Sequence, residues 1–463
     1  MSSIKQIIKV AFFVLLFLLN NSCKTFVSKI RSNNGVFYID PENFNDRYQN
    51  GSIDHPFDSW IKITNNDLWS KGTVFLQKCG TVYRKSLFLI GLANGFPDNP
   101  IIIGAYGKGV RPKIIANGLY AISIRDCKNW IIRDFDLSGA TSQVLQIYAQ
   151  NDDVENVKIL NCHINGSTLE KKSGKHCVQA RNKNGINDLY HINNIEIAYN
   201  LIENAGDTNL NSDGIYLGAV KSNAYIHHNI IQNNSGNGID IAGGSNHIAE
   251  FNKLINNAGS KAHGQQYPLI SVVIRNNLIV QHKSIYYNSF GLSLQDSFNG
   301  KLYNNTVYLN NLGTGAFILC SFINPKAFTG NIIINNIFYG SSKGRAAVRI
   351  LPELVDRFEK YNNIFDNNII SNQRNSNYII IHMKQEKENS FYINKENIDN
   401  WMNKHKGDLL VDFCFTNPEK DDFTLDKKVI ALGVKPRKDL VGSYDIKHMG
   451  ADLNEINKIN FKK

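Results

Sequence analysis

The chain has 463 residues, about three times the length of a typical domain of roughly 150 residues, which predicts several domains or one elongated repeat. A hydrophobic content of 42% with 20% charged residues excludes global disorder, and 34 glycines with 10 prolines exclude a collagenous chain. The net charge of +11 favours a polyanionic partner, such as nucleic acid, an acidic glycan or a membrane surface, with an ordinary basic surface as the equal alternative.

The N-terminus predicts export. Lys5 and Lys9 precede the apolar run 10–19, which is too short to span a bilayer, and Ser22 and Cys23 follow it. This segment resembles a bacterial lipoprotein signal, in which Cys23 is lipidated, although asparagines occupy positions 20 and 21. We therefore expect residues 1–23 to be a lipoprotein signal, with ordinary cleavage or an uncleaved anchor as alternatives. The expected location is the bacterial cell envelope, at the outer membrane, periplasm or cell surface.

An exported, lipid-anchored protein contacts the membrane only through its anchor, and export disfavours nucleic acid as a partner. The other cysteines fit no zinc motif because no second cysteine or histidine pair stands at ligand spacing. Buried thiols are expected, and export leaves a disulfide chemically possible. These cysteines are Cys79, Cys127, Cys162, Cys177, Cys320 and Cys414.

Residues 24–71 are expected to form an N-terminal extension and cap, within which 55–69 forms a short amphipathic helix over the first repeat. From residue 72 an internal repeat dominates the chain. The repeated motif is apolar-x-x-Asn-x-apolar, as in IAYNLI, IHHNII, IRNNLI and LYNNTV. It recurs every 23 to 38 residues. Stacked asparagines that hydrogen-bond along one axis would explain the 63 asparagines of the chain. The fourth positions of the motif are Phe135, Cys162, Asn200, Asn229, Asn252, Asn277, Asn305, Asn336 and Asn367.

Each repeat also contains an earlier alternating run, such as GIYLG (214–218) or GIDIA (238–242), which predicts a short strand with one face inward. Turns rich in glycine and asparagine separate the strands, and helical periodicity is nearly absent. This layout closely resembles the right-handed parallel β-helix family of pectate lyases and related exported bacterial polysaccharide-active proteins. The resemblance implies an all-β solenoid over 72–385, with an irregular C-terminal cap over 386–463. We expect a monomer.

The resemblance places the asparagine ladder between the second and third strands of each coil, so the alternating runs are first strands, and their outer face forms the substrate groove. The long segments 165–175, 203–212, 256–269 and 281–290 are expected to be loops walling that groove. Outward residues at the same strand position in successive coils should form columns along the solenoid. The first column is predicted as Gln143, His176, Asp213, Asn237, Phe290 and Thr314, and the central column as Gln146, Gln179, Tyr216, Asp240, Ser293, Phe317 and Arg349. The third column is predicted as Tyr148, Arg181, Gly218, Ala242 and Gln295.

Adjacent coils stack about 4.8 Å apart, so His176 should neighbour Asp213, and Tyr216 should neighbour Asp240. A carboxylate beside a histidine raises its pKa and orients it for proton transfer. Arg181 at the edge of the patch would neutralise a substrate carboxylate. The predicted catalytic residues are His176, Arg181, Asp213, Tyr216 and Asp240. The expected substrate-binding residues are Lys175, Gln179, Lys221, Tyr286 and Tyr287.

The ordinary alternative for any one of these residues is a polar side chain on a solvent-facing strand. His227 and His228 lie on a second strand without a ligand companion, so no metal site is assigned. Asp152, Asp153 and Asp296 fall in turns, which favour aspartate for backbone reasons.

The leading functional hypothesis is a polysaccharide lyase that cleaves an acidic, uronic-acid-containing glycan by β-elimination. Calcium-dependent pectate lyases of this fold use an acidic cluster, and Asp213 and Asp240 have no evident third partner, so the cofactor stays unknown, with Ca²⁺ possible. The first alternative is an inverting glycoside hydrolase that uses this pair of carboxylates. The second is a non-catalytic glycan-binding surface lipoprotein.

Overall fold

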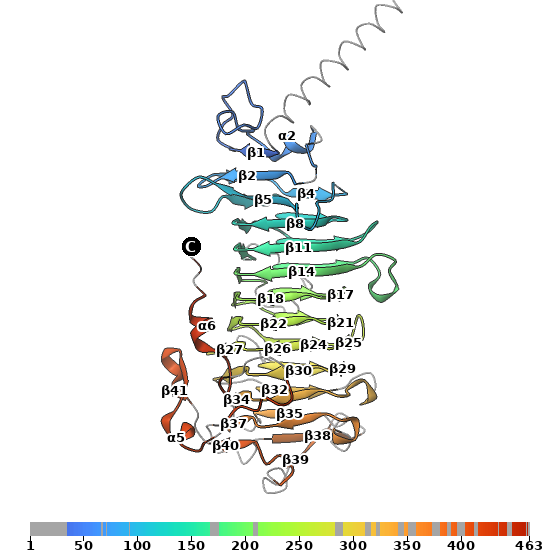
Figure 1. The fold of residues 1–463 in the computed structure, drawn as a ribbon, viewed down its shortest axis with the longest axis vertical. Helices are drawn as coiled ribbons and strands as arrows, with labels where there is room; N and C mark the ends of the chain where they lie inside the picture. Colours follow the sequence, from blue (N-terminus) through green and yellow to red (C-terminus); the bar gives the residue numbers. More distant parts are fainter. Residues whose placement is uncertain are drawn as a thin grey trace, which may run out of the picture.

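The computed structural model describes residues 35–459 and 461, except 66–67, 71, 92, 167–175, 207–211, 283–289, 311–315, 321–324, 341–346, 351–357, 373–379, 387–389, 396–402, 412–414, 434 and 442–446. These residues form an elongated stack of coils, and each full coil contributes one strand to each of three long sheets (Figure 1). The predicted all-β parallel solenoid is confirmed. No helix among the described residues is long and apolar enough to cross a membrane.

The first sheet takes the first strand of each coil, and its strands pair in parallel except for the last two. It contains β4 (Leu87–Ile90), β7 (Ile122–Arg125), β10 (Leu145–Ala149), β13 (Val178–Asn182), β16 (Ile215–Leu217), β20 (Asn237–Ile241), β24 (Gly259–His263), β28 (Leu292–Gln295), β32 (Phe317–Cys320), β35 (Val348–Ile350), β38 (Ile380–Glu386) and β39 (Ser390–Lys395).

The second sheet follows, with four short strands along its side. Its main strands are β1 (Val36–Ile39), β2 (Val74–Lys78), β5 (Ile101–Tyr106), β8 (Lys128–Arg133), β11 (Val154–Leu160), β14 (Ile192–Ala198), β18 (Tyr225–His227), β22 (Ile248–Glu250), β26 (Val273–Arg275), β30 (Lys301–Tyr303), β33 (Ile332–Ile334) and β36 (Ile364–Asp366). The side strands are β17 (Val220–Ser222), β21 (Gly244–Ser245), β25 (Leu269–Ile270) and β29 (Ser297–Phe298).

The third sheet completes each coil. It contains β3 (Val82–Tyr83), β6 (Lys113–Ile115), β9 (Asp136–Ser138), β12 (His163–Asn165), β15 (Leu201–Glu203), β19 (Ile230–Gln232), β23 (Lys253–Ile255), β27 (Leu278–Gln281), β31 (Thr306–Leu309), β34 (Ile337–Gly340), β37 (Ile369–Asn372) and β40 (Leu409–Val411). Parallel pairing therefore begins before residue 72, at β1, and continues past residue 385, at β40.

The remaining elements are short. They are α2 (Trp60–Asn65), α5 (Lys427–Ile430), α6 (Leu453–Asn457), the hairpin β41 (Phe415–Asn417) and β42 (Asp422–Leu425), and the 3-10 turns η1 (Gly185–Asn187), η2 (Pro325–Ala327), η3 (Glu359–Tyr361) and η4 (Pro418–Lys420). The helix expected within 55–69 is α2. Its Trp60 is buried, donates a hydrogen bond to Gln77 of β2 and packs near Phe75, so α2 covers the first coils.

The interior is a continuous apolar core because alternate residues of every strand point inward. The inward column of the second sheet shows the stacking at single-residue register. It runs Ile103, Ile132, Ile159, Ile197, Ile226, Ala249, Ile274, Leu302, Ile333 and Phe365. Cys127, Cys162 and Cys177 are buried thiols, as expected, whereas Cys79 is only partly buried. Burial raises the pKa of Cys162 to about 12.

The asparagine ladder lies between the second and third sheets, as predicted. Asn229, Asn252, Asn277 and Asn305 stack in one inward column, and each side-chain amide donates to the next side-chain oxygen at 3.0 Å. This satisfies buried amide groups in each coil from Asn200 to Asn368. One position was predicted wrongly. The ladder continues from Asn336 to Asn368, not to Asn367, and ends at Asp408.

The ladder explains only part of the asparagine content. Among the described residues, 23 non-glycine positions have positive φ and 15 of them are asparagine. Asparagine tolerates the left-handed region better than most residues, so it recurs where each coil bends. Asn367 belongs to this second group, with φ of 55°.

The segment after β40 does more than cap the end of the solenoid. It runs back along the stack and packs on the outer face of the third sheet (Figure 1). Phe415 and Phe423 bury their rings against Tyr308. Phe461, near the C-terminus of the chain, lies under Arg111, whose guanidinium carbon is 4.0 Å from the ring centroid. The tail is therefore a lateral cover over many coils.

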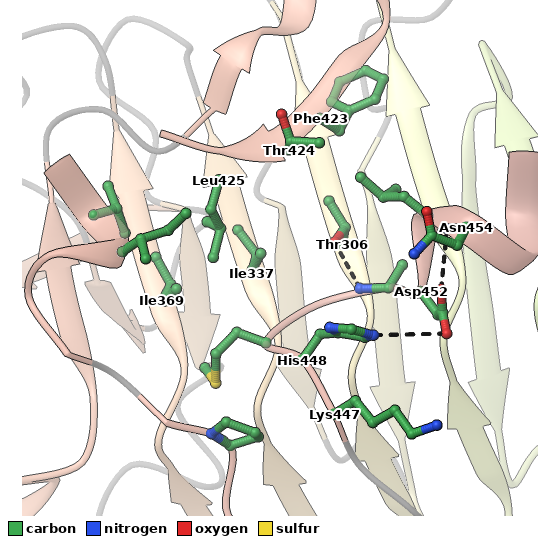
Figure 2. A pocket seen from close by; sticks show the side chains of 16 residues that line it. Thr306, Ile337, Ile369, Phe423, Thr424, Leu425, Lys447, His448, Asp452 and Asn454 are labelled. Carbon is green, nitrogen blue, oxygen red and sulfur yellow. Dashed lines mark hydrogen bonds and ion pairs between the residues drawn. The ribbon is translucent and has the colours of Figure 1, made fainter. Parts of the chain in front are cut away.

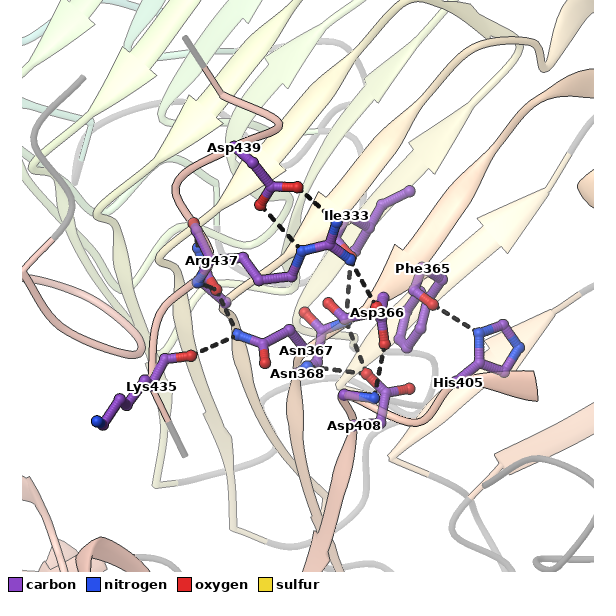
Figure 3. Close-up of polar contacts among 12 residues, drawn as sticks. Ile333, Phe365, Asp366, Asn367, Asn368, His405, Asp408, Lys435, Arg437 and Asp439 are labelled. Carbon is purple, nitrogen blue, oxygen red and sulfur yellow. Dashed lines mark hydrogen bonds and ion pairs between the residues drawn. The ribbon is translucent and has the colours of Figure 1, made fainter. Parts of the chain in front are cut away.

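Polar contacts at the last coils fasten this tail (Figure 3). Arg437 donates to Asp366 at 2.7 Å and also pairs with Asp439. Asn367 donates to the carbonyl of Lys435 at 3.0 Å, and Asn335 exchanges two hydrogen bonds with the backbone of Arg437. Outward asparagines at positive φ thus bind the backbone amides of the tail.

The tail also encloses a cavity of about 390 Å³ against the third sheet (Figure 2). Ile337 and Ile369 of the sheet face Phe423 and Leu425 of the tail hairpin across it. His448 and Asp452 lie at its polar edge, with 3.8 Å between His448 Nε2 and Asp452 Oδ2.

Candidate functional site

The outer face of the first sheet carries the predicted polar columns, with two corrections. The segment 256–269 is not simply a loop, because it contains β24, a full strand between β20 and β28. Lys261 therefore lies between Asp240 and Ser293 in the central column, and Ile318, not Phe317, continues it. The column reads Gln146, Gln179, Tyr216, Asp240, Lys261, Ser293, Ile318 and Arg349.

His176 and Asp213 are adjacent, as the repeat alignment predicted. The His176 ring nitrogen Nδ1 lies 3.0 Å from the backbone nitrogen of Asp213 and 3.2 Å from its Oδ2. One nitrogen cannot accept from the backbone N–H and donate to the carboxylate at once, so the protonation of the ring selects the partner. The backbone N–H of Asp213 donates to Nδ1, which places the ring proton on Nε2. Moving that proton to Nδ1, beside Asp213 Oδ2, would leave Nε2 as a base.

Asp240 contacts two side chains of the next strand, β24. Its Oδ1 accepts from His263 Nε2 at 2.9 Å, and its Oδ2 pairs with Lys261 Nζ at 3.0 Å. Burial raises the pKa of the Asp240 carboxyl, but the hydrogen bond from His263 and the charge of Lys261 outweigh burial and hold its pKa below the ordinary value. Asp240 is therefore an anion at neutral pH.

Asn237 joins the two carboxylates. Its backbone N–H donates to Asp213 Oδ1 at 2.6 Å, and its side-chain Nδ2 lies 3.0 Å from the same oxygen and 3.4 Å from Asp240 Oδ2. These two oxygens can be separated by no more than the sum of the last two distances. These contacts connect His176, Asp213, Asn237, Asp240, Lys261 and His263 into one network across four successive coils.

Tyr216 covers this network. Its ring stacks on His176 with 4.6 Å between centroids and lies so close to Gly218 that a side chain there would collide with it. Burial, then the charges of Asp240 and Asp213, raise the pKa of Tyr216 to about 12. Its hydroxyl therefore keeps its proton at any physiological pH and is a proton donor.

The other predicted residues are placed as follows. Arg181 of β13 is exposed, lies over the Tyr148 ring at 5.9 Å, and acts electrostatically on Tyr216. Gln179 is buried in the central column beside Tyr216. Lys221 is exposed but lies on β17 of the second sheet, so the structure does not place it on the first-sheet face with His176. Lys175, Tyr286, Tyr287 and Cys23 lie outside the described residues.

Sequence reasoning missed Lys261 and His263. Both lie on β24, whose inward residues Ser260 and Ala262 are too small or polar to show apolar alternation. A signal was nevertheless present, because the spacing of 23 to 28 residues between ladder asparagines in this part of the chain leaves room for a first strand in every coil. We name the cluster of His176, Asp213, Tyr216, Asp240, Lys261 and His263 the first-sheet cluster.

The cluster does not fit calcium. Ca²⁺ takes six to eight oxygen ligands, whereas the carboxylate oxygens of Asp213 and Asp240 already face nitrogen donors. Among the described residues no three histidine, cysteine, aspartate or glutamate side chains are grouped as metal ligands. No step is therefore assigned to a metal ion.

The aspartates expected to serve turns do so where the structure describes them. Asp152 pairs with Lys128 at 2.9 Å and accepts from the Asp153 backbone, while Asp296 has a positive φ at the end of β28. His227 is buried on β18, and His228 follows it at positive φ.

Comparisons with known proteins agree with this architecture. Residues 109–270 match the family described as the right-handed beta helix region. A GH136 lacto-N-biosidase from Eubacterium ramulus superposes with a TM-score of 0.57 at 13% identity, covering 76% of this chain and 66% of that enzyme, just under two thirds of its length.

Two lyases are more distant in shape. A PL6 family polysaccharide lyase from Pseudopedobacter saltans gives a TM-score of 0.43 at 15% identity, covering 81% of this chain and 96% of that one. A pectate lyase gives 0.42 at 13% identity, covering 72% and 79%. No curated protein sequence matches the chain. Likeness at such low identity establishes architecture and leaves activity to the site. With its three parallel sheets, its internal ladder and the matched region, the chain is a right-handed parallel β-helix protein.

Proposed function

We propose that the protein is a carbohydrate-active enzyme that cleaves an acidic, uronic-acid-containing polysaccharide by β-elimination at the first-sheet cluster. The observation that carries this proposal is the protonation pattern of the cluster. Asp240 is held as an anion, Tyr216 is held protonated, and His176 has a carboxylate at Nδ1. The proposed proton donor is therefore Tyr216 rather than Asp240, and the proposed proton acceptor is His176.

β-Elimination needs three contributions, and each has a candidate. Arg181 is an exposed cation that would neutralise the uronate carboxylate and so acidify the adjacent C–H bond, while Lys261 pairs with Asp240. His176, oriented by Asp213, would take that proton at Nε2. The C–O bond to the leaving sugar then breaks, its electrons passing to the leaving oxygen, which Tyr216 protonates, and a C=C bond forms in the remaining uronate.

Glycoside hydrolysis by Asp213 and Asp240 is the second candidate, and the pKa of Asp240 disfavours it. A hydrolase requires one carboxylic acid with a raised pKa, whereas the pKa of Asp240 is lowered. The Asn237 bridge also keeps the gap between Asp213 Oδ1 and Asp240 Oδ2 below the roughly 6.5–9.5 Å typical of inverting enzymes. The fold resemblance to a hydrolase keeps this candidate in the test.

A panel of acidic polysaccharides tests the proposal with two readouts. Elimination generates an unsaturated uronate that absorbs near the ultraviolet edge, whereas hydrolysis generates reducing ends without that absorbance. We expect both signals to rise together on at least one uronate polymer. Reducing ends without absorbance would establish the hydrolase instead. Binding without any turnover across the panel would establish a non-catalytic glycan-binding protein.

We also propose that the protein is anchored in the bacterial cell envelope through lipid on Cys23, acting there as a monomer. Replacing Cys23 with serine should move it from the membrane fraction to the soluble fraction, because one lipidated residue supplies the anchor. A Cys23→Ser protein that stays in the membrane fraction would rule out this anchor.

A further inference from the structure

The outer face of the second sheet carries a groove that the first-sheet cluster does not use. The groove has a volume of about 460 Å³ and lies over β8, β11, β14 and β18. Pro97, Pro100 and Ile131 give it apolar walls, and Tyr225 lines it beyond the ion pair of Lys158 and Glu196.

A row of asparagines forms one side of this groove. Asn129, Asn156, Asn194 and Asn223 occupy equivalent positions in four successive coils, and all have φ between 51° and 67°. Asn156 donates to Asn129 at 2.8 Å, and Asn223 donates to Asn194 at 2.9 Å. Asn129 and Asn194 also donate to the Gly95 carbonyl and to Glu155 Oε1, so each of these two amides has one N–H and one oxygen lone pair left for a ligand.

Tyr225 is fixed in place at the other side. Its ring stacks on His227 with 4.0 Å between centroids, and its hydroxyl donates to Glu250 at 2.5 Å. Glu250 is held in turn by Arg275 at 2.5 Å. A rigid, partly exposed aromatic ring beside oriented amides lowers the entropic cost of binding.

The charges and the spacing identify the ligand class. Among the described residues that line the groove, Lys158 and Glu196 are the charged ones, and they pair with each other at 2.7 Å, so their charges do not favour an acidic chain. The coils repeat about every 4.8 Å, close to the length of one pyranose residue, whereas an extended peptide advances about 3.3 Å per residue. We infer that this groove binds an uncharged oligosaccharide that runs along the solenoid axis.

This inference does not rest on the proposed elimination activity, because the groove and the first-sheet cluster are on different sheets. The last coils offer a precedent within the molecule, since outward asparagines there already bind amide groups of the tail. The groove asparagines lie at a different bend of the coil but share the positive φ, and they would bind sugar hydroxyl or acetamido groups.

Calorimetric titration of the full chain with cellohexaose and chitohexaose tests the inference. The variant Asn194→Gly/Asn223→Gly removes two amides, and glycine tolerates the positive φ at both sites. Asn246→Gly is the matched control, since Asn246 has φ of 57° in the same row but does not line the groove. We expect the double variant to weaken binding by about tenfold or more and the control to stay within about twofold.

Equal affinity of the parent, the double glycine variant and the Asn246→Gly control would overturn the inference. So would a parent protein that binds neither cellohexaose nor chitohexaose at millimolar concentration. Stronger binding of oligouronates than of neutral sugars at this groove would also overturn it. His176→Ala should bind cellohexaose or chitohexaose as the parent does. Loss of turnover in His176→Ala tests the first-sheet cluster, whereas loss of oligosaccharide binding in the double glycine variant tests the groove on the second sheet.

Discussion

The first and third sheets have similar apolar inner faces, but their outer faces differ in what covers them. Outward residues of the third sheet, such as Tyr308 and Tyr339, are buried under the aromatic residues of the tail. Outward residues of the first sheet, such as Tyr216 and Asp240, form a hydrogen-bonded and charged network. Inward residues thus build the same coil everywhere, while outward residues decide whether a face packs against the chain itself or is available for chemistry.

Truncating an aromatic residue under the tail should have the largest effect on stability. Phe415 is fully buried against Tyr308 and Tyr339, so Phe415→Ala should lower the free energy of unfolding by about 3–5 kcal/mol. Phe88, on the outer side of the first sheet, is 45% exposed, and Phe88→Ala should cost less than about 1 kcal/mol. Urea denaturation measures both, and equal losses would refute the contrast between the two faces.

The ladder should be the next most sensitive feature, because it runs through successive coils from Asn200 to Asp408. Asn277→Ala removes an oxygen that accepts from Asn252 and an amide that donates to Asn305 and to the carbonyl of Ala249. Leaving these buried groups unpaired should cost about 2–4 kcal/mol in urea denaturation. The outward Asn246→Gly should cost less than about 1 kcal/mol. A ladder variant as stable as the outward one would show that buried amides there are dispensable.

A smaller, pH-dependent effect should come from His163 on the third sheet. Burial lowers its pKa, but hydrogen bonds and charge from Asp136 and Glu203 outweigh burial and raise the pKa from 6.5 to about 9. Protonated His163 therefore stabilises the fold, fully below pH 6.5, and this contribution is lost as the pH rises through 9.

The expected contribution is about 2–3 kcal/mol, which His163→Gln should remove. Denaturation at several pH values between 6 and 10 measures it as the difference between the parent and the variant. The two stabilities should converge as the pH approaches 10. Parallel curves would contradict the raised pKa.

The fold was predictable because its pattern is local and repeated. Each coil places apolar residues and one asparagine at the same positions, and a pattern repeated so often survives individual exceptions. The register failed where the local pattern was ambiguous. The doublet of Asn367 and Asn368 offers two ladder candidates, and the structure uses the second, while the first takes a positive φ.

The site was predictable only in part. His176 and Asp213 follow from stacking, since equivalent positions of neighbouring coils must touch. Lys261 and His263 were missed because the small inward residues of β24 hide the strand. The course of the tail has no local signal, since its contacts with the third sheet join residues about a hundred positions apart in the chain.

The central claim is that the first-sheet cluster performs the chemistry of this protein. Initial rates of ultraviolet-absorbing product on a cleaved polyuronate, for His176→Ala and Asp213→Ala beside the turn variant Asp152→Asn, test it most directly. Losing either member of the acid–base pair should lower turnover by about a hundredfold or more with the fold intact, while Asp152→Asn stays near the parent rate. Near-full activity in both cluster variants would contradict the account and place the active centre elsewhere.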